Sequence, residues 1–172
     1  FSYRHGRSDA GARLRVSRYL AQTQSRIWIA RRDISKYGES MDHGIIMADF
    51  ERLFNPEPEL LKLMQEACSF TIEADGTIKR NNCGLPTGTF LQVLWENIYL
   101  LDLDRTMSLF DRALYLRFGD DILLLSPDFG LHQSAIAAMD DQVSQRRLDY
   151  NGAKVLDREL VRPHLIPKGG AG

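Results

Sequence analysis

The chain has 172 residues, 44% of them hydrophobic and 26% charged, which excludes collagen-like, disordered and disulfide-scaffold proteins and predicts one folded domain. No stretch reaches the roughly 18 apolar residues of a membrane span, and two cysteines suit a reducing compartment, so we expect a cytoplasmic protein with no membrane partner. The net charge of −1 hides an asymmetry, because residues 1–36 carry nine basic and two acidic side chains and the remainder is acidic.

The first part of the chain predicts a basic helix, a strand and two further helices. Ser8 can cap a helix that runs to about residue 25. Residues 27–30 are a short apolar run, typical of a buried strand that ends near Asp33. Helices are predicted over residues 41–54 and 59–68, because apolar residues recur there at helical spacings.

The second part alternates hairpins with helices. One hairpin is expected over residues 69–80, around an Asp-Gly turn, and a glycine-bearing loop follows. A largely buried helix is predicted from residue 89 to 103, with helical character to about residue 111. A second hairpin, over residues 113–126, precedes a helix that ends near residue 147. This order predicts an α+β domain with an antiparallel sheet.

The second hairpin carries the sharpest chemical feature, two adjacent carboxylates at its turn. Asp120 and Asp121 lie between apolar strands, where an unpaired charge is costly. If the strand that ends at Asp33 pairs beside this hairpin, Asp33 and Asp120 could hold two Mg²⁺ ions roughly 3.5–4 Å apart. The structural alternative is an exposed Gly-Asp-Asp turn, with Asp33 paired to a neighbouring arginine.

A loop with two glycines, residues 84–89, leads into the long helix. Glycines permit close backbone approach to a nucleotide or a template base. The alternative is a plain turn with a helix cap at Thr87 or Thr89.

In order and spacing these segments resemble the motifs of reverse transcriptases, above all the bacterial group of group II intron maturases and retrons. Residues 33–43 resemble motif A, residues 84–104 motif B with its helix, the Gly-Asp-Asp hairpin motif C and residues 148–154 motif D. Residues 1–8 look like the segment just before the palm. The resemblance implies a polymerase palm, with an antiparallel sheet packed on helices. Palms of this kind serve retroelement mobility, phage defence and retron DNA synthesis alike.

The resemblance also implies a reaction, template-directed transfer of a nucleotide from a nucleoside triphosphate to a primer 3′-hydroxyl on an RNA or DNA template. Asp33 and Asp120 would ligate two Mg²⁺ ions, for which Mn²⁺ could substitute. Asp121 would support the site, and the carbonyl of Ile34 would add a ligand. Lys154, at the motif D lysine, would approach the departing pyrophosphate as an acid or a stabilising charge.

Further residues would contact the nucleotide, the template or phosphates. By resemblance, the nucleotide and template contacts are Tyr37, Gly38, Pro86, Thr87, Gly88, Thr89 and Gln92. Arg4 and Arg7 are candidate phosphate ligands, and their alternative is a solvated basic arm.

Four positions depart from the family pattern. Gly38 stands where the family has a bulky aromatic residue that collides with a ribose 2′-hydroxyl, so we expect weak discrimination against ribonucleotides unless Tyr37 turns into the vacant space. Thr87 replaces the usual glutamine and Gln92 a usual serine. Gly119 replaces alanine, as in many RNA-dependent RNA polymerases.

We divide the chain into a basic arm on the fingers side (1–26), a palm (27–156) and a loosely ordered tail (157–172). Fingers motifs and a thumb are missing from it, so we expect it to need further polypeptide or a partner subunit and to polymerise poorly alone. Two alternatives stay open. One is an RNA-synthesising polymerase or nucleotide cyclase on the same palm, and the other is a non-catalytic palm that binds RNA or docks a partner.

Overall fold

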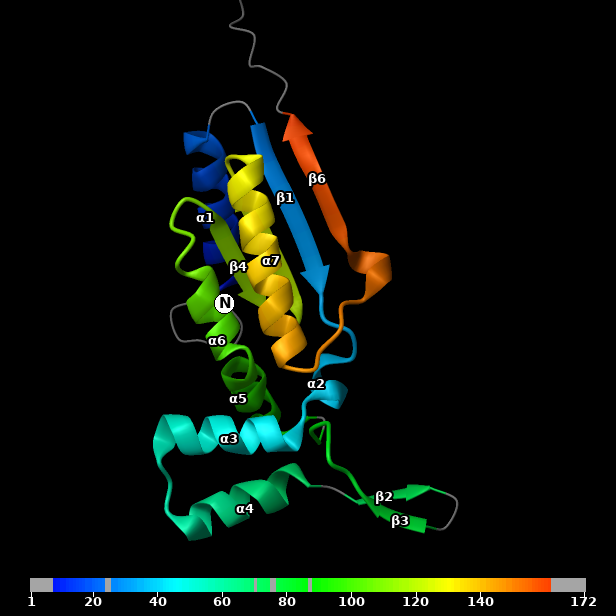
Figure 1. Ribbon diagram of the computed structural model, residues 1–172. Coiled ribbons are helices and arrows are strands. Elements are labelled where there is room, and N and C mark those ends of the chain that lie inside the picture. The colour runs from blue at the N-terminus through cyan, green and yellow to red at the C-terminus, as the bar shows by residue number, and fades with distance from the viewer. Residues whose placement is uncertain (1–7, 24–25, 70, 75–76, 87, 162–172) are drawn as a thin grey trace, which may run out of the picture.

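Figure 1 shows the computed structural model, in which a twisted sheet lies above a helical extension. The structure describes residues 8–23, 26–69, 71–74, 77–86 and 88–161. In chain order the elements are α1 (Asp9–Gln22), β1 (Arg26–Asp33), α2 (Tyr37–Ser40), α3 (His43–Phe54), α4 (Pro58–Cys68), β2 (Thr71–Ala74), β3 (Thr77–Arg80), α5 (Phe90–Tyr99), α6 (Leu101–Met107), β4 (Leu114–Phe118), β5 (Asp121–Ser126), α7 (Phe129–Gln145), the 3₁₀ turn η1 (Gly152–Lys154) and β6 (Leu156–Val161). Within these ranges none of the helices combines the length and apolar character needed to span a bilayer.

The main sheet has four strands in the order β4-β5-β1-β6, and every neighbouring pair is antiparallel. In the register of β1 and β5, Asp33 lies opposite Asp121. The sheet and the helices beside it confirm the predicted α+β class, with an antiparallel sheet packed on helices.

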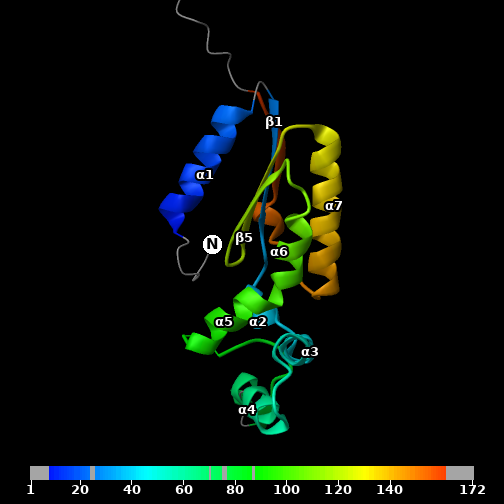
Figure 2. The same ribbon diagram turned by 90° about the vertical axis from the view of Figure 1, so that its left-hand side faces the viewer.

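Both faces of the sheet are covered, because successive side chains of a strand point to opposite faces. Leu124 belongs to the larger core cluster together with Trp95 and Tyr99. Its neighbour Leu125 packs in a second cluster with Ile27, beneath partly buried side chains of α1. Figure 2 shows α1 on one side of the sheet and α6 and α7 on the other.

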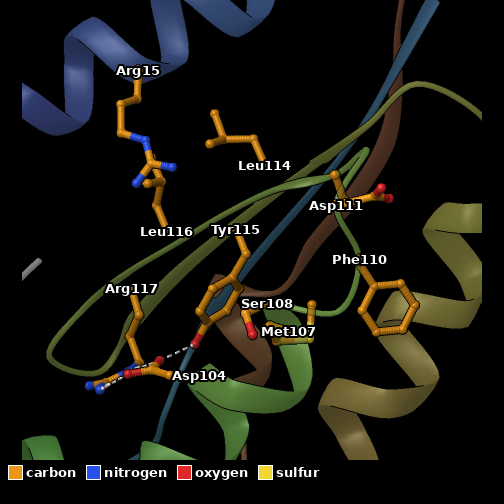
Figure 3. Close-up of a pocket in the computed structure, with 11 residues that line it drawn as sticks. Arg15, Asp104, Met107, Ser108, Phe110, Asp111, Leu114, Tyr115, Leu116 and Arg117 are labelled. Carbon is orange, nitrogen blue, oxygen red and sulfur yellow. Dashed lines mark hydrogen bonds and ion pairs between the residues drawn. The ribbon is translucent and has the colours of Figure 1, made fainter.

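A buried ion pair joins α6 to the edge strand β4 (Figure 3). The Arg117 guanidinium donates Nε to Asp104 Oδ1 at 2.9 Å and a terminal nitrogen to Oδ2 at 2.8 Å. The Tyr115 hydroxyl donates to the same Oδ1 at 2.9 Å. Burial raises the pKa of Tyr115, so this phenol stays a donor at neutral pH. The Arg117 side chain is only 5% exposed, so this carboxylate, and not water, stabilises its positive charge.

The helical extension lies beneath the sheet in Figure 1, where α3 and α4 lie one above the other and the β2–β3 hairpin projects to the side. It shares the larger hydrophobic core with the sheet layer through Ile46 and Phe50 of α3, and ion pairs add a second link. Arg146, just after α7, donates to the buried carboxylate of Asp49 on α3 and also to Asp102 on α6. This shared guanidinium connects three helices.

The loop that precedes α5 is held by main-chain hydrogen bonds. The amide of Gly84 donates to the carbonyl of Met41 at 2.8 Å, and the amide of Leu85 donates to the carbonyl of Gly38 at 2.9 Å. Gly84 has φ +86°, and a Cβ there would lie 2.9 Å from the Glu39 carbonyl oxygen. Gly88 also has positive φ, +81°, but a Cβ there would meet nothing within 4 Å.

Three local features differ from the sequence predictions. The long helix expected from residue 89 is broken at Leu100, whose backbone (φ −105°, ψ 18°) separates α5 from α6. Residues 37–40 form the short helix α2, where only a break in the pattern was expected. A loosely ordered tail was expected from residue 157, but residues 157–161 belong to strand β6. This strand lies at the edge of the sheet, where charged side chains can stay in water. Residues 162–172 lie outside the described residues.

Replacing Arg117 by methionine should lower the free energy of unfolding by about 3–5 kcal/mol, because it leaves the Asp104 carboxylate without its bidentate partner. Arg105→Met is the matched control, since Arg105 is 57% exposed in its ion pair with Asp102, and it should cost at most about 1 kcal/mol. Urea unfolding measures both variants. Equal costs would contradict the structural role assigned to the buried pair.

Alanine at the two loop glycines should separate backbone strain from steric collision. Gly88→Ala should lower the free energy of unfolding by about 1–2 kcal/mol, from the left-handed backbone alone. Gly84→Ala should cost clearly more, about 3 kcal/mol, because its Cβ also meets the Glu39 carbonyl. Thermal unfolding of the two variants tests the order, and a larger loss for Gly88→Ala would refute it.

Candidate functional site

Three carboxylates lie near one another at one end of the main sheet, where β1 ends beside the β4–β5 turn. Asp33 is the last residue of β1 and lies opposite Asp121, the first residue of β5. One residue further, the amide of Ile34 donates to the carbonyl of Asp120 at 3.1 Å. Gly119, in the same turn, has φ +62°, a conformation that favours glycine. The antiparallel register therefore brings the predicted motif A and motif C carboxylates together.

The segment before η1 pairs with the same strand end from the other side. The amide of Asn151 donates to the carbonyl of Asp33, and the amide of Ser35 donates to the carbonyl of Asp149, both at 2.8 Å. An isolated antiparallel bridge joins Ile34 to Tyr150. These contacts place the predicted motif D segment, which ends at Lys154, directly beside Asp33.

Lys154 makes an ion pair with Asp33. Its Nζ lies 2.7 Å from Asp33 Oδ2, with the carboxylate side chain 5% exposed and the lysine side chain 53% exposed. This hydrogen bond raises the pKa of Lys154, and the negative charges of Asp33, Asp121 and Asp120 act in the same direction. The lysine is therefore protonated at neutral pH and faces all three carboxylates.

Arg31 supplies a second positive charge at the site. A terminal nitrogen of its guanidinium lies 3.0 Å from Asp121 Oδ1, and about half of each side chain is exposed. Among the described residues, Asp120 is in no side-chain hydrogen bond or ion pair, which leaves its carboxylate oxygens available to a ligand.

The donor set fits a hard divalent cation, because carboxylate and carbonyl oxygens are the ligands that Mg²⁺ prefers. Asp33 and Asp120 contribute carboxylates from neighbouring strand ends. The described ranges contain no group of three or more His, Cys, Asp or Glu side chains already placed around a metal position. Two carboxylates alone do not fill the coordination shell of a cation, so a bound substrate and water would have to supply the remaining ligands.

Around Gly38, the structure brings together three side chains from α2 and α5. The Tyr37 ring is buried and its hydroxyl donates to the carbonyl of Glu96 at 2.6 Å, so Tyr37 does not turn into the space beside Gly38. Burial also raises the pKa of Tyr37. That space faces Gln92 instead, since a Cβ on Gly38 would lie 3.2 Å from Gln92 Nε2.

Gln92 is itself held at both ends of its amide. Its Oε1 accepts from the Gly88 amide at 3.0 Å, and its Nε2 donates to Glu96 Oε1 at 2.9 Å. Glu96 was not among the predicted site residues. Its position four residues after Gln92 on a helix indicates that the two side chains can touch.

The remaining predicted contacts have plainer roles or lie outside the described residues. The Thr89 hydroxyl caps α5, accepting from the Gln92 amide at 3.3 Å and donating to the Pro86 carbonyl at 3.1 Å. Thr89 and Pro86 thus take part in the N-terminal cap of α5. Arg4, Arg7 and Thr87 lie outside the described residues.

A groove of about 520 Å³ with Asp121 in its lining lies between α1 and the β4–β5 hairpin. Leu116, Leu123 and Phe118 form apolar lining, and Arg13 and Arg31 add positive charge. Asp121 also lines the groove, so it is continuous with the carboxylate site. Arg13 is paired with Asp9, which also lines the groove, and Arg31 is paired with Asp121. A ligand with apolar faces and anionic groups that can replace these carboxylates on the arginines matches this lining.

Comparison with known proteins identifies the fold. No family model and no curated protein matches the chain. Solved structures do match. Apo telomerase from Candida tropicalis, truncated from its C-terminal domain, has a TM-score of 0.68 at 12% identity over 91% of this chain and 36% of that one. Telomerase from Candida albicans, in complex with a fragment of telomeric RNA, has a TM-score of 0.71 at 13% identity over 88% of this chain and 30% of that one. The chain thus spans about a third of these telomerase chains and has a reverse-transcriptase-like fold.

Proposed function

We propose that this chain is the palm of a reverse-transcriptase-like polymerase that transfers nucleotides to a primer 3′-hydroxyl under the direction of a template. The observation that carries the proposal is the meeting of Asp33, Asp120 and Asp121 with Lys154 at one end of the sheet. The fold shared with the telomerase structures supports it, and so does the order of the sequence motifs. The same motifs support a bacterial type related to group II intron maturases and retrons.

Asp33 and Asp120 would bind the divalent cations, Mg²⁺ or Mn²⁺, with the Ile34 carbonyl as a further ligand and Asp121 in support. When bound, such ions activate the attacking hydroxyl and stabilise the charge of the leaving pyrophosphate. The chain itself would hold the two carboxylates near each other, because β1 pairs with β5 and the Ile34 amide donates to the Asp120 carbonyl. A preorganised site of this kind needs little rearrangement during the reaction.

Lys154 would meet the departing pyrophosphate. Its ammonium is half exposed and already near three carboxylates, and its raised pKa keeps it protonated. A protonated lysine can donate a hydrogen bond, and then a proton, to an oxygen that gains negative charge.

The groove beside α1 would accommodate the nucleic acid. Apolar side chains on its lining suit bases and sugars, and the arginines of α1 and β1 suit phosphates. The nucleotide end of the site would lie near Gly38, Gln92 and the loop around Gly88, which hydrogen bonds already connect. Fingers and thumb elements, or a partner subunit, would complete the grip on the template and primer.

RNA synthesis is a second candidate reaction, and Gly38 favours it. The carboxamide of Gln92, not an aromatic ring, occupies the space next to Gly38. A carboxamide can hydrogen-bond a ribose hydroxyl, whereas a bulky ring in that place would exclude it.

Asp120→Ala should reduce metal-dependent primer extension by at least about 100-fold, because it removes a carboxylate on which the cations depend. The measurement is extension of a labelled primer by the complete polypeptide that contains this chain. Asp141→Ala is the control, since Asp141 is exposed on α7, and it should extend normally. Undiminished synthesis by the Asp120 variant would sink the assignment.

Ribonucleotides should be accepted, with a ratio of kcat/KM for dNTP over rNTP below about 100. Single-nucleotide incorporation on one primer–template, with each nucleotide type in turn, measures this ratio. The double variant Gly38→Phe, Gln92→Ala restores an aromatic side chain and removes the amide that would collide with it, so it should raise the ratio. A ratio of thousands for the unchanged protein would contradict the prediction.

A further inference from the structure

We propose that Lys154 is the resident counter-ion of Asp33 and that a divalent cation binds this carboxylate by displacing it. The inference rests on the proposed function, because it concerns the cation that Asp33 would hold. It adds an exchange of positive charge that links cation binding to the release of a lysine inside the site.

The carboxylate of Asp33 is buried. With its side chain 5% exposed, the carboxylate has lost most of its hydration, and a charge in this position needs a partner of opposite sign. In the part of the chain that the structure describes, Lys154 is the cationic side chain in contact with it. A cation-free protein without this lysine would hold an uncompensated buried charge.

The two partners differ in exposure to solvent. The Lys154 side chain is 53% exposed and lies on the short turn η1, so its ammonium can move into water at little desolvation cost. Asp33 cannot move in the same way. Its carbonyl accepts from the Asn151 amide, and the Ile34 amide donates to the Asp120 carbonyl, which fixes the strand end on both sides. The lysine is therefore the partner that leaves.

The balance of charge at the site also favours the exchange. Three carboxylates and two basic side chains, Lys154 and Arg31, give the site a net charge of −1. If a divalent cation enters while the lysine stays, the site becomes positive and the ammonium repels the ion at short range. If the cation replaces the lysine, the site is neutral. Exchange is thus the favoured way to load the first ion.

Exchange predicts that the lysine competes with the cation. The test measures Mn²⁺ affinity of the 172-residue chain by the electron paramagnetic resonance of free Mn²⁺, without any nucleotide. Lys154→Met keeps the aliphatic stem and removes the charge, and it should bind Mn²⁺ at least about tenfold more tightly than the unchanged chain. Lys154→Arg keeps the charge and should stay within about threefold of it.

Two controls identify the site. Lys62→Met makes the same substitution on the exposed surface of α4 and should leave Mn²⁺ affinity unchanged. Asp33→Asn should abolish the tight binding in both the unchanged and the Lys154→Met backgrounds. If neither background shows binding that depends on Asp33, the proposed metal site fails, and the exchange fails with it. If binding depends on Asp33 but Lys154→Met binds equally or more weakly, the exchange alone is overturned.

A second measurement observes the Lys154 side chain directly in the unchanged chain. The chain has five lysines, so ¹³C-dimethylated lysine side chains give few NMR signals, and Lys154→Arg assigns the one of interest. Adding Mg²⁺ should shift this signal toward the value of a solvent-exposed lysine, and Asp33→Asn should give that value without Mg²⁺. A Lys154 signal that stays unchanged while Mg²⁺ binds at Asp33 would overturn the exchange.

Discussion

The position of β1 between β5 and β6 is the constraint on which the site depends. Antiparallel pairing on the β5 side puts Asp33 opposite Asp121, and the chain that leads into β6 returns along the other side with Asn151 bonded to the Asp33 carbonyl. A shift of one residue in the β1–β5 register would break the first alignment and turn the side chains of β1 to the opposite faces. The two core clusters, which claim Ala30 and Ile27 on different faces, oppose such a shift.

The sequence predicted the parts of this arrangement that local patterns encode. The apolar run before Asp33 and the two runs around the Gly-Asp-Asp turn identify β1, β4 and β5, and the carboxylates follow from where those runs end. β6 was not predicted, because Leu156 and Leu160 are separated by charged residues, as suits an edge strand with little burial. The break at Leu100 was not predicted either, because the apolar pattern continues through this buried residue.

The contacts within the site were harder to anticipate than its residues. Lys154, which was predicted to approach a departing pyrophosphate, also makes an ion pair with Asp33. The two residues are 121 positions apart, so no local pattern encodes this pairing. Tyr37 was left open as an alternative to the aromatic side chain missing at Gly38, but the carbonyl of Glu96 holds its hydroxyl in the core. Gln92 faces Gly38 because Gly88 and Glu96 fix both ends of its amide. Such pairings depend on helix packing, which the order of residues specifies only collectively.

The hydrogen bonds that fix the start of the loop before α5 run between main-chain atoms, from Gly84 to Met41 and from Leu85 to Gly38. Main-chain bonds do not change when a neighbouring side chain is replaced. Natural variation can therefore exchange side chains further along this loop while the backbone at its start keeps its place. A scaffold of this kind lets the side chains of the loop vary without a compensating change in the sheet.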